Sequence, residues 1–144
     1  MKILSFSDVK LGEGRTREFI LIEIKHMFSV IFYKWETRDQ IRFHSHAFPS
    51  IAILLWGWYA EQVITRTRTQ LTSIVDRRVA RRWWPRFLPR GYTHSIKYAA
   101  PRTFSLNLRG PWSPTWREYF PDTGTWVTYG WGRKKLAKER APLT

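Results

Sequence analysis

Short segments rich in β-branched and aromatic residues recur along this chain, and turn-forming residues separate them. The segments lie at residues 18–25, 29–35, 41–48, 51–69, 86–98, 102–110 and 125–131. The turn-forming residues lie at 37–39, 89–91, 100–101, 110–111 and 121–124. Short strands with turns of this kind between them are typical of β-sandwiches and β-barrels. The sequence therefore predicts an all-β fold.

Helix signals are weak by comparison. Residues 73–82 place Ile74, Val75 and Val79 at a spacing that suits a short helix, and a strand is the alternative there. Residues 133–144 form a basic C-terminal tail, for which helix and disorder are the alternatives. A chain of 144 residues that is 43% hydrophobic suits one core. We therefore expect a single domain over residues 1–132, followed by the tail.

The composition also limits the chemistry and the location. The chain has no cysteine, which excludes disulfide bonds and thiolate metal sites. No stretch reaches the roughly 18 apolar residues of a membrane-spanning helix, and the N-terminus lacks the pattern of a signal peptide. These features predict a cytoplasmic protein without a membrane partner.

Two of the four histidines lie one residue apart in the segment FHSHAF, at positions 44 and 46. On a strand, alternate side chains share a face, so His44, His46 and the neighbouring Arg42 are expected on one face. Two imidazoles at this spacing can bind one ion, and imidazole is a good ligand for zinc, iron, copper and nickel. A third ligand is available in the segment PRGYTH, where His94 follows a tight turn.

The spacing of these residues resembles the two sequence motifs of the cupin superfamily. The first motif is HxH followed by a glutamate and then a glycine, and His44, His46 and Gly57 match it. Ser50 stands where the glutamate is expected. The second motif contains PxGxxH, which residues 89–94 match in full.

The resemblance covers roughly residues 30–126, because residues 109–126 also look like the end of small cupins of bacteria and phages. It implies a double-stranded β-helix, or jelly roll, with the histidines inside the barrel. It also implies a bacterial or phage-encoded origin and suggests a homodimer, since cupins are often dimers.

The resemblance further implies one divalent metal ion, iron, zinc, nickel or copper, held by His44, His46 and His94. Without the motif glutamate, three neutral imidazoles would leave the ion its full charge and open coordination positions. Protons should then compete with the metal below roughly pH 6. The alternative is a cupin that has lost its metal and only binds ligands. His26 lies outside both motifs and is expected to be an ordinary, partly buried histidine.

Other residues near the motifs are candidates for catalysis or ligand binding. Glu61 could act as an acid or base, although a solvent-facing or ion-paired role is the simpler interpretation. Ser50 could donate a hydrogen bond to a metal-bound water or a ligand. An inward-facing arginine needs a carboxylate or phosphate partner. The predicted ligand-binding residues are Arg42, Arg90, Tyr92, Trp56 and Tyr59.

The net charge is +14, from 25 Lys and Arg against 11 Asp and Glu, and the chain contains nine tryptophans. Basic residues concentrate between positions 66 and 90, including Arg66 and Arg68, and such a surface attracts anions. The leading hypothesis is a metal-binding cupin that binds or transforms a phosphate- or carboxylate-bearing small molecule. As an enzyme it would resemble dioxygenase, isomerase or hydrolase cupins. The alternatives are a non-catalytic binding module for a nucleotide-like ligand and a nucleic-acid-binding protein.

Overall fold

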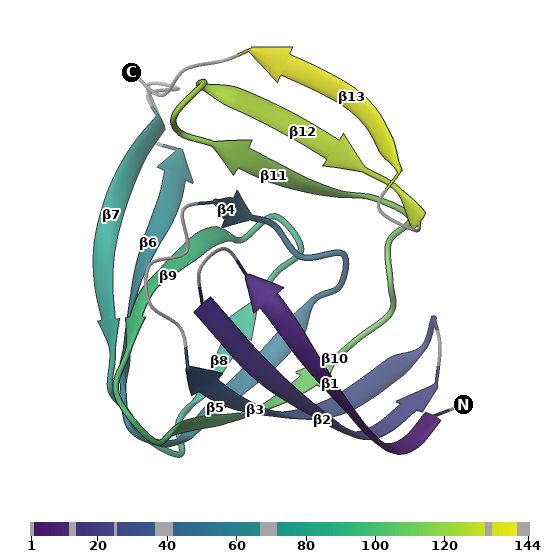
Figure 1. Ribbon diagram of the computed structural model, residues 1–144, viewed down its shortest axis with the longest axis vertical. Coiled ribbons are helices and arrows are strands. Elements are labelled where there is room, and N and C mark those ends of the chain that lie inside the picture. The colour runs from purple at the N-terminus through teal and green to yellow at the C-terminus, as the bar shows by residue number, and fades with distance from the viewer. Residues whose placement is uncertain are drawn as a thin grey trace.

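The computed structural model describes residues 2–11, 14–24, 26–36, 42–66, 72–131 and 134–140. These residues form thirteen strands and no α-helix (Figure 1). The strands are β1 (Lys2–Leu11), β2 (Gly14–Ile24), β3 (Phe28–Glu36), β4 (Phe43–His44), β5 (Ser50–Trp56), β6 (Tyr59–Arg66), β7 (Thr72–Val79), β8 (Pro85–Leu88), β9 (Thr93–Ala99), β10 (Thr103–Arg109), β11 (Trp116–Phe120), β12 (Thr125–Tyr129) and β13 (Lys135–Arg140).

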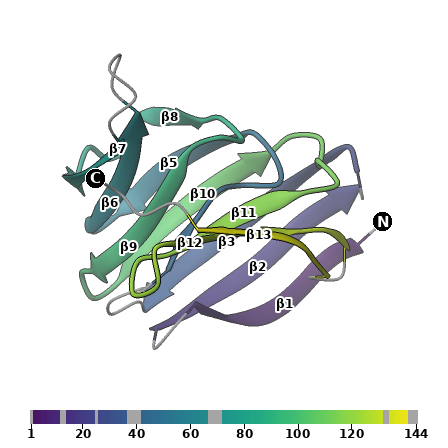
Figure 2. The same cartoon turned by 90° about the horizontal axis from the view of Figure 1, so that it is seen from above.

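The strands make two antiparallel sheets that form the two layers of a jelly roll (Figures 1 and 2). One sheet, the β3 sheet, has the order β1-β2-β3-β10-β5-β8. The other, the β9 sheet, has the order β13-β12-β11-β4-β9-β6-β7. Strands distant in sequence pair in both, such as β3 with β10 and β4 with β9. The predicted all-β jelly roll is therefore confirmed.

Burial alternates along the strands, as expected for strands with one face toward an interior. On β3, the side chains of Ser29, Ile31 and Tyr33 are buried while their neighbours are more exposed. A cluster that joins the two sheets comprises Leu54, Tyr59, Val79, Ile96 and Ala99. The interior between the sheets carries both this core and the candidate site.

Several elements differ from their sequence-based expectations. Residues 73–82 fall largely in strand β7, so the strand alternative is correct there. The tail forms strand β13 over Lys135–Arg140, where helix and disorder were the alternatives, because its backbone pairs with β12. Strands β1 and β11 had no sequence prediction. The predicted turn at 37–39 and Arg68 lie outside the described residues. Nothing helical in the described chain is long and apolar enough to cross a membrane.

The motif glycine Gly57 forms the turn between β5 and β6. Its φ is +79°, a left-handed conformation that side chains other than glycine rarely adopt. A Cβ atom at this position would lie only 2.8 Å from the Cα of Thr103. Gly57 is thus required both by its backbone conformation and by the close approach of β10.

Candidate metal centre

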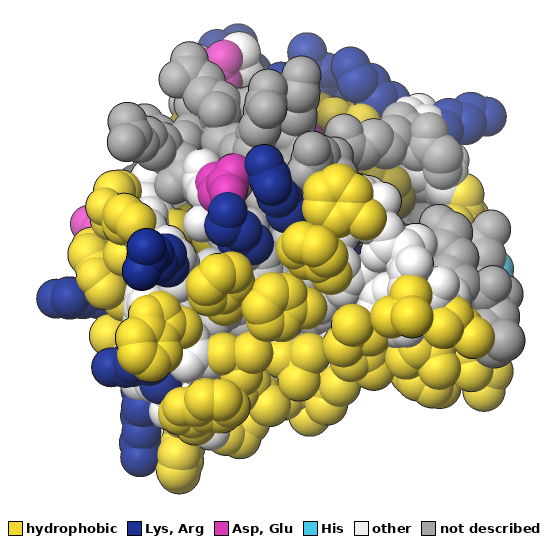
Figure 3. Space-filling view, turned by 60° about the horizontal axis from the view of Figure 1, so that its bottom comes forward, with side chains coloured by type: hydrophobic (Ala, Val, Ile, Leu, Met, Phe, Trp, Pro, Cys, Tyr) yellow, Lys and Arg dark blue, Asp and Glu magenta, His cyan; other side chains and the backbone are white. Residues whose placement is uncertain are grey.

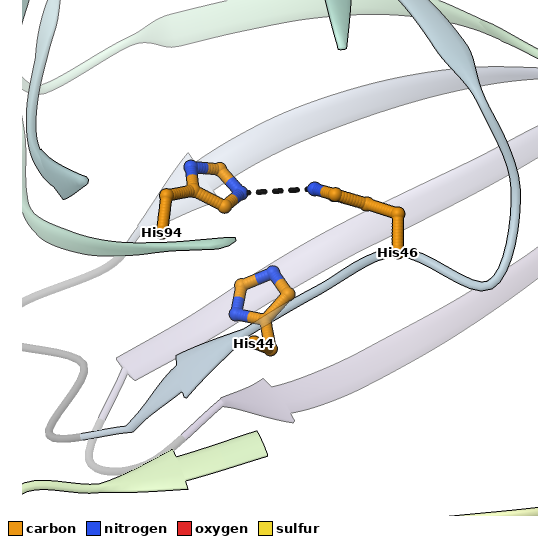
Figure 4. Close-up of side chains that lie close together, drawn as sticks. All are labelled: His44, His46 and His94. Atoms are coloured by element: carbon orange, nitrogen blue, oxygen red, sulfur yellow. Dashed lines mark hydrogen bonds between the residues drawn. The ribbon is translucent and has the colours of Figure 1, made fainter. Parts of the chain in front are cut away.

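The three predicted histidines converge on one point inside the barrel (Figure 4). His44 on β4 lies directly opposite His94 on β9, and their ring centroids are 4.8 Å apart. The Nε2 atoms of His46 and His94 are 3.1 Å apart. One ligating nitrogen from each of the three rings lies within 4.8 Å of the others. The predicted convergence of His44, His46 and His94 is therefore present in the structure.

Backbone contacts on both sides hold the HxH segment in place. Strand β4 is only two residues long and lies between β11 and β9. Beyond it, the Ser45 amide donates to the Arg117 carbonyl at 2.8 Å, and the Arg117 amide donates to Ser45 Oγ at 2.8 Å. The His46 amide donates to the Arg90 carbonyl at 3.2 Å. These bonds fix His46 beside His44 although His46 lies outside the strand.

A buried carboxylate fixes the orientation of His94. Oε2 of Glu61 lies 2.9 Å from Nδ1 of His94, and Glu61 is only 1% exposed. The register between β6 and β9 shifts here: Ala60 pairs with Tyr98 and Glu61 with Ile96, so the extra residue is Lys97 on β9, a β-bulge of the kind that redirects side chains. When Nδ1 of His94 donates to this carboxylate, its Nε2 is left as the acceptor that faces His46.

Glu61 is itself held by two further side chains, Arg86 and Tyr92, and Tyr59 in turn holds Arg86. Arg86 Nη2 donates to Glu61 Oε1 at 2.6 Å, and the Tyr92 hydroxyl donates to the same oxygen at 2.7 Å. Arg86 Nη1 donates to the Tyr59 hydroxyl at 2.6 Å. Burial raises the pKa of the Glu61 carboxyl, but the hydrogen bond and charge of His94, with Arg86 and Tyr92, bring it down to about 2. Glu61 is thus an anion at neutral pH.

The two histidines of the HxH motif are held in the neutral form. Burial, followed by the neighbouring His94 and His46, lowers the pKa of His44 well below its usual value. Burial and His94 likewise lower the pKa of His46 to about 3, although the charge of Glu61 opposes the shift. Neutral imidazole is the form that binds metal ions.

The histidines lie on one wall of a cavity of about 390 Å³ between the two sheets. On the β3 sheet, Arg109 Nη2 donates to Glu18 Oε1 at 3.0 Å, and both residues line the cavity. Asn107 lines the same side. Among the described residues, Asn107 Oδ1 and Arg109 Nε are buried without a hydrogen-bond partner. The cavity thus has imidazoles on one sheet and a polar group of amide, guanidinium and carboxylate on the other.

The predicted site residues divide between the cavity and its surroundings. Arg42 is exposed and lines the cavity, and its Cζ lies 4.8 Å from the centroid of the Phe120 ring. Tyr59 also lines the cavity but is buried in the core. Glu61 is buried and ion-paired, so the ion-paired interpretation is correct and the solvent-facing one is wrong. His26 is exposed, against the expectation of partial burial, because it lies in the turn between β2 and β3.

The other predicted residues lie away from the cavity wall. Ser50 is buried but is absent from the described residues that line the cavity. Trp56 is 57% exposed on the outer face, where Arg82 lies 4.7 Å from its ring. Arg90 is exposed and donates to the Pro111 carbonyl. Tyr92 lies behind His94 and contacts Glu61 instead of the cavity.

Three charged residues and one amide that line the cavity were not predicted: Glu18, Arg109, Glu118 and Asn107. Asn107 and Arg109 lie in a predicted strand, and alternation along it could have placed them on one face. Glu118 lies opposite His44 on β11, a strand that the sequence analysis did not assign.

Comparisons with known proteins place this geometry in a fold family. No protein-family model matches the chain, and no curated protein matches it. The structure of KdgF from Halomonas sp. superposes on 76% of this chain and 94% of its own, with a TM-score of 0.53 and 14% identity. The chain has the cupin fold. The three-histidine group is consistent with that assignment.

Two larger proteins contain the same cupin fold. Oxalate decarboxylase from Bacillus subtilis matches 74% of this chain at 15% identity and a TM-score of 0.50. The 7S globulin of Momordica charantia matches 81% at 16% identity and a TM-score of 0.51. The matched part spans 27% of the decarboxylase chain and 36% of the globulin chain. At these identities the comparisons establish only the fold of this chain, and its activity has to be argued from its own residues.

Proposed function

We propose that this cupin holds one divalent metal ion with His44, His46 and His94. The observation that carries the proposal is the convergence of their nitrogens on the cavity wall. Two imidazoles on a tetrahedral zinc ion, each about 2.05 Å away, have nitrogens roughly 3.3 Å apart. The His46–His94 distance of 3.1 Å is close to this value. Nitrogen-only ligands favour zinc, iron, copper or nickel.

A bound ion would supply Lewis acidity, since three neutral ligands leave its charge uncompensated. The protein's own residues would supply the preorganisation. Glu61 holds the proton on Nδ1 of His94, so Nε2 is presented to the ion with its lone pair. The depressed pKa values of His44 and His46 keep their rings unprotonated at neutral pH. Loading the ion therefore requires the hydrogen bond between His46 and His94 to break and the proton on Nε2 of His46 to move to its Nδ1.

The ligand that we propose is a small anion bearing a phosphate or carboxylate group. Arg42 lies on the cavity wall with the histidines, and the guanidinium of Arg109 faces them from the other sheet. Since Glu18 already neutralises Arg109, Arg42 is the cation available to a ligand. Trp112 and Trp116 also line the cavity and could stack on a nucleotide-like base. A non-catalytic binding module would use the same residues to hold the ligand. Only a measurement of whether the bound ligand is converted to product distinguishes that module from an enzyme.

Elemental analysis tests the proposal on full-length protein purified without an affinity tag or added metal. We expect close to one equivalent of a transition metal, or uptake of one when zinc, nickel or iron is added. His94→Ala and His44→Ala should abolish uptake. His26→Asn is the control, since His26 lies outside the centre and asparagine tolerates its φ of 71°. Retained uptake in both alanine variants would contradict the proposal.

A second candidate function is single-stranded nucleic-acid binding near the β7–β8 turn. Trp83 and Trp84 are exposed there, and Arg81 lies 3.8 Å from the Trp84 ring. Exposed indoles beside arginines can stack on bases and neutralise phosphates. Affinity for oligonucleotides should then fall steeply with salt, and Trp83→Ala should weaken it. Binding that is weak even at low salt would eliminate this function.

A further inference from the structure

A polar cluster lies on the wall of the cavity that faces the histidines. It comprises Glu18 on β2 and Asn107 and Arg109 on β10, and we call it the far-wall cluster. The Arg109 guanidinium contacts two aromatic rings, with its Cζ 4.4 Å from the Phe48 centroid and 5.4 Å from the Tyr33 centroid. Its Nη2 donates to Glu18 Oε1, and the side chains of Arg109 and Glu18 are only 11% and 15% exposed. These contacts hold the cluster in place inside the barrel.

The fold does not require polar side chains at these positions. Asn107 lies between Ile31 and Ala52 in register, and both of these neighbours are buried and apolar. Hydrophobic side chains gather on the opposite face of the same sheet (Figure 3), where the rings of Phe32 and Phe104 stack with centroids 5.5 Å apart. At the cluster, the sheet thus carries polar side chains toward the cavity and apolar ones away from it, the reverse of the usual arrangement.

Two atoms of the far-wall cluster have unused hydrogen-bonding capacity. Asn107 Oδ1 and Arg109 Nε are buried, and neither has a hydrogen-bond partner among the described residues. By contrast, Ser105, two residues earlier on the same face of β10, accepts a hydrogen bond from Trp35 Nε1 at 2.8 Å. Buried polar groups without partners lower the stability of a folded chain, so most of them have one. An acceptor and a donor left open on a cavity wall therefore indicate a ligand group that bonds to both.

The chemistry of the far-wall cluster favours a neutral ligand group over a charged one. The Glu18 carboxylate already balances the Arg109 guanidinium, so the pair carries no net charge. A carboxylate placed there would lie against Glu18, and it offers no proton to Asn107 Oδ1. An ammonium group could donate to Oδ1, but it has no lone pair for the Nε–H of Arg109. A hydroxyl group both donates and accepts, so it can satisfy the two atoms together.

We infer that the far-wall cluster binds a hydroxyl group of the ligand whose anionic group lies near Arg42 and the histidines. The inference rests on the proposed anion site, and it narrows the ligand to a hydroxy acid with its hydroxyl at the end opposite the anionic group. Asn107 and Arg109 are two residues apart on one face of β10, about 7 Å along the strand, so one hydroxyl or two neighbouring hydroxyls can contact both side chains. Packed sheets lie about 10 Å apart, so a short-chain acid can reach both walls.

Calorimetric titration of the full-length protein with matched pairs of acids tests the inference. The pairs are γ-hydroxybutyrate with butyrate and δ-hydroxyvalerate with valerate, whose members differ only in the terminal hydroxyl. In at least one pair, we expect the hydroxy acid to bind the wild type at least about tenfold more tightly, the effect of a hydrogen bond to a charged group. Asn107→Leu removes the acceptor and should reduce that ratio by at least about fivefold, the effect of one neutral hydrogen bond. Ser105→Ala is the matched control and should leave the ratio unchanged, because the Ser105 hydroxyl already bonds to Trp35.

Urea denaturation of the ligand-free variants gives a second readout, which a structural role of Asn107 would move in the opposite direction. Asn107→Leu replaces a buried acceptor that lacks a partner with an apolar side chain beside Ile31 and Ala52, so the urea midpoint should rise. Ser105→Ala leaves Trp35 Nε1 without its acceptor, so the midpoint should fall. A midpoint lowered by Asn107→Leu would overturn the inference, because Asn107 would then serve the fold.

The binding results separate this inference from the proposed function. Equal affinities of the wild type for both acids of each pair would overturn the inference while the anion site stands. A ratio reduced equally by Asn107→Leu and Ser105→Ala would also overturn it. If none of the acids binds, the proposed anion site and the inference both fail. Metal uptake by Asn107→Leu should equal that of the wild type, because Asn107 lies on the wall opposite the histidines.

Discussion

The Nδ1 atom of His94 lies 2.9 Å from Oε2 of Glu61, and both side chains are buried. Carboxylates that hold a metal-binding imidazole in this way raise its basicity and fix its tautomer. Glu61→Gln keeps the size of the side chain but removes its charge. We expect about 10- to 100-fold weaker metal binding by calorimetry, the usual effect of losing such a partner. Asp76→Asn, on the exposed strand β7, is the control and should leave affinity unchanged.

The same substitution should lower the free energy of unfolding. Without the carboxylate, Arg86 keeps its charge but loses its ion-pair partner, and breaking such a buried pair costs about 3–5 kcal/mol. Arg86 retains 24% exposure, so we expect a loss near the lower end, about 3 kcal/mol. Urea denaturation of the metal-free variant measures it. A loss similar to that of Asp76→Asn would show that Glu61 contributes little.

Stability of the metal-free protein should fall as the pH drops below neutrality. The folded pKa values of His44 and His46 lie below the unfolded value of 6.5, so unfolding takes up protons in this range. The loss should begin near pH 6.5 and continue toward pH 3. Glu61 adds a second loss between about pH 4.5 and pH 2, because its folded pKa is the lower one. Urea denaturation at a series of pH values checks the prediction. In the His46→Gln variant, the free energy of unfolding should depend less on pH between about pH 6.5 and pH 4.5.

The lowered pKa of His46 also changes the expected competition between protons and metal. An ordinary imidazole loses metal below roughly pH 6. Since His46 in the folded protein takes up a proton only near pH 3, uptake should persist below pH 6. Thermal melting with and without zinc, compared at pH 7 and pH 5, measures this. Complete loss of the metal-induced rise in melting temperature at pH 5 would contradict the prediction.

The two motif glycines should differ sharply in their tolerance of alanine. At Gly57, a Cβ atom would meet the backbone of Thr103, and its φ of +79° is strained for alanine, so we expect a loss of roughly 2 kcal/mol or more. At Gly91, a Cβ atom would have no described atom within 4 Å of it, so Gly91→Ala should change stability by less than about 0.5 kcal/mol. Urea denaturation of both variants measures the contrast, and equal losses would contradict it.

Arg42 should matter more than Arg90 for anion binding. Arg42 lines the cavity, whereas Arg90 is exposed and donates to the Pro111 carbonyl. Arg42→Gln should weaken the binding of phosphate or acetate to the metal-loaded protein by about 1.5–3 kcal/mol, the value of one charge-assisted hydrogen bond. Arg90→Gln should leave it unchanged. Equal weakening in a calorimetric titration would favour a general charge effect over a contact with the ligand.

The three histidines of the candidate metal centre could be predicted from the sequence because both motifs are defined by short, local spacings between residues. Strand alternation and the PxGxxH turn indicated that His44, His46 and His94 would meet. The role of Glu61 was not predictable, since the register shift between β6 and β9 at this position leaves no distinct pattern of residue types. Trp56, which was predicted to bind the ligand, lies on the outer face beside Phe104 on β10, and only the pairing of β5 with β10 reveals this position.

Two of the missed strands, β11 and β13, share a physical cause. Strands β11 and β13 have sequences rich in charged residues, WREYF and KLAKER, and their backbones are ordered by pairing with β12. The intrinsic strand propensity of a segment has little influence where a paired strand supplies its backbone hydrogen bonds. Missing β11 also meant missing Glu118, which its pairing with β4 places opposite His44.

The pairing of β4 with β9 sets when the proposed metal centre can form. His46 and His94 are separated by 48 positions in the chain, and β4 contributes only two residues to the pairing. Contacts between such distant segments require the long loop between them to close first, so we expect them to form more slowly than local contacts. In a chain that has not finished folding, only His44 and His46 are therefore available to bind an ion. His94 joins them when β9 pairs with β4 and the barrel closes. Metal loading of this protein should follow folding in time and report its completion.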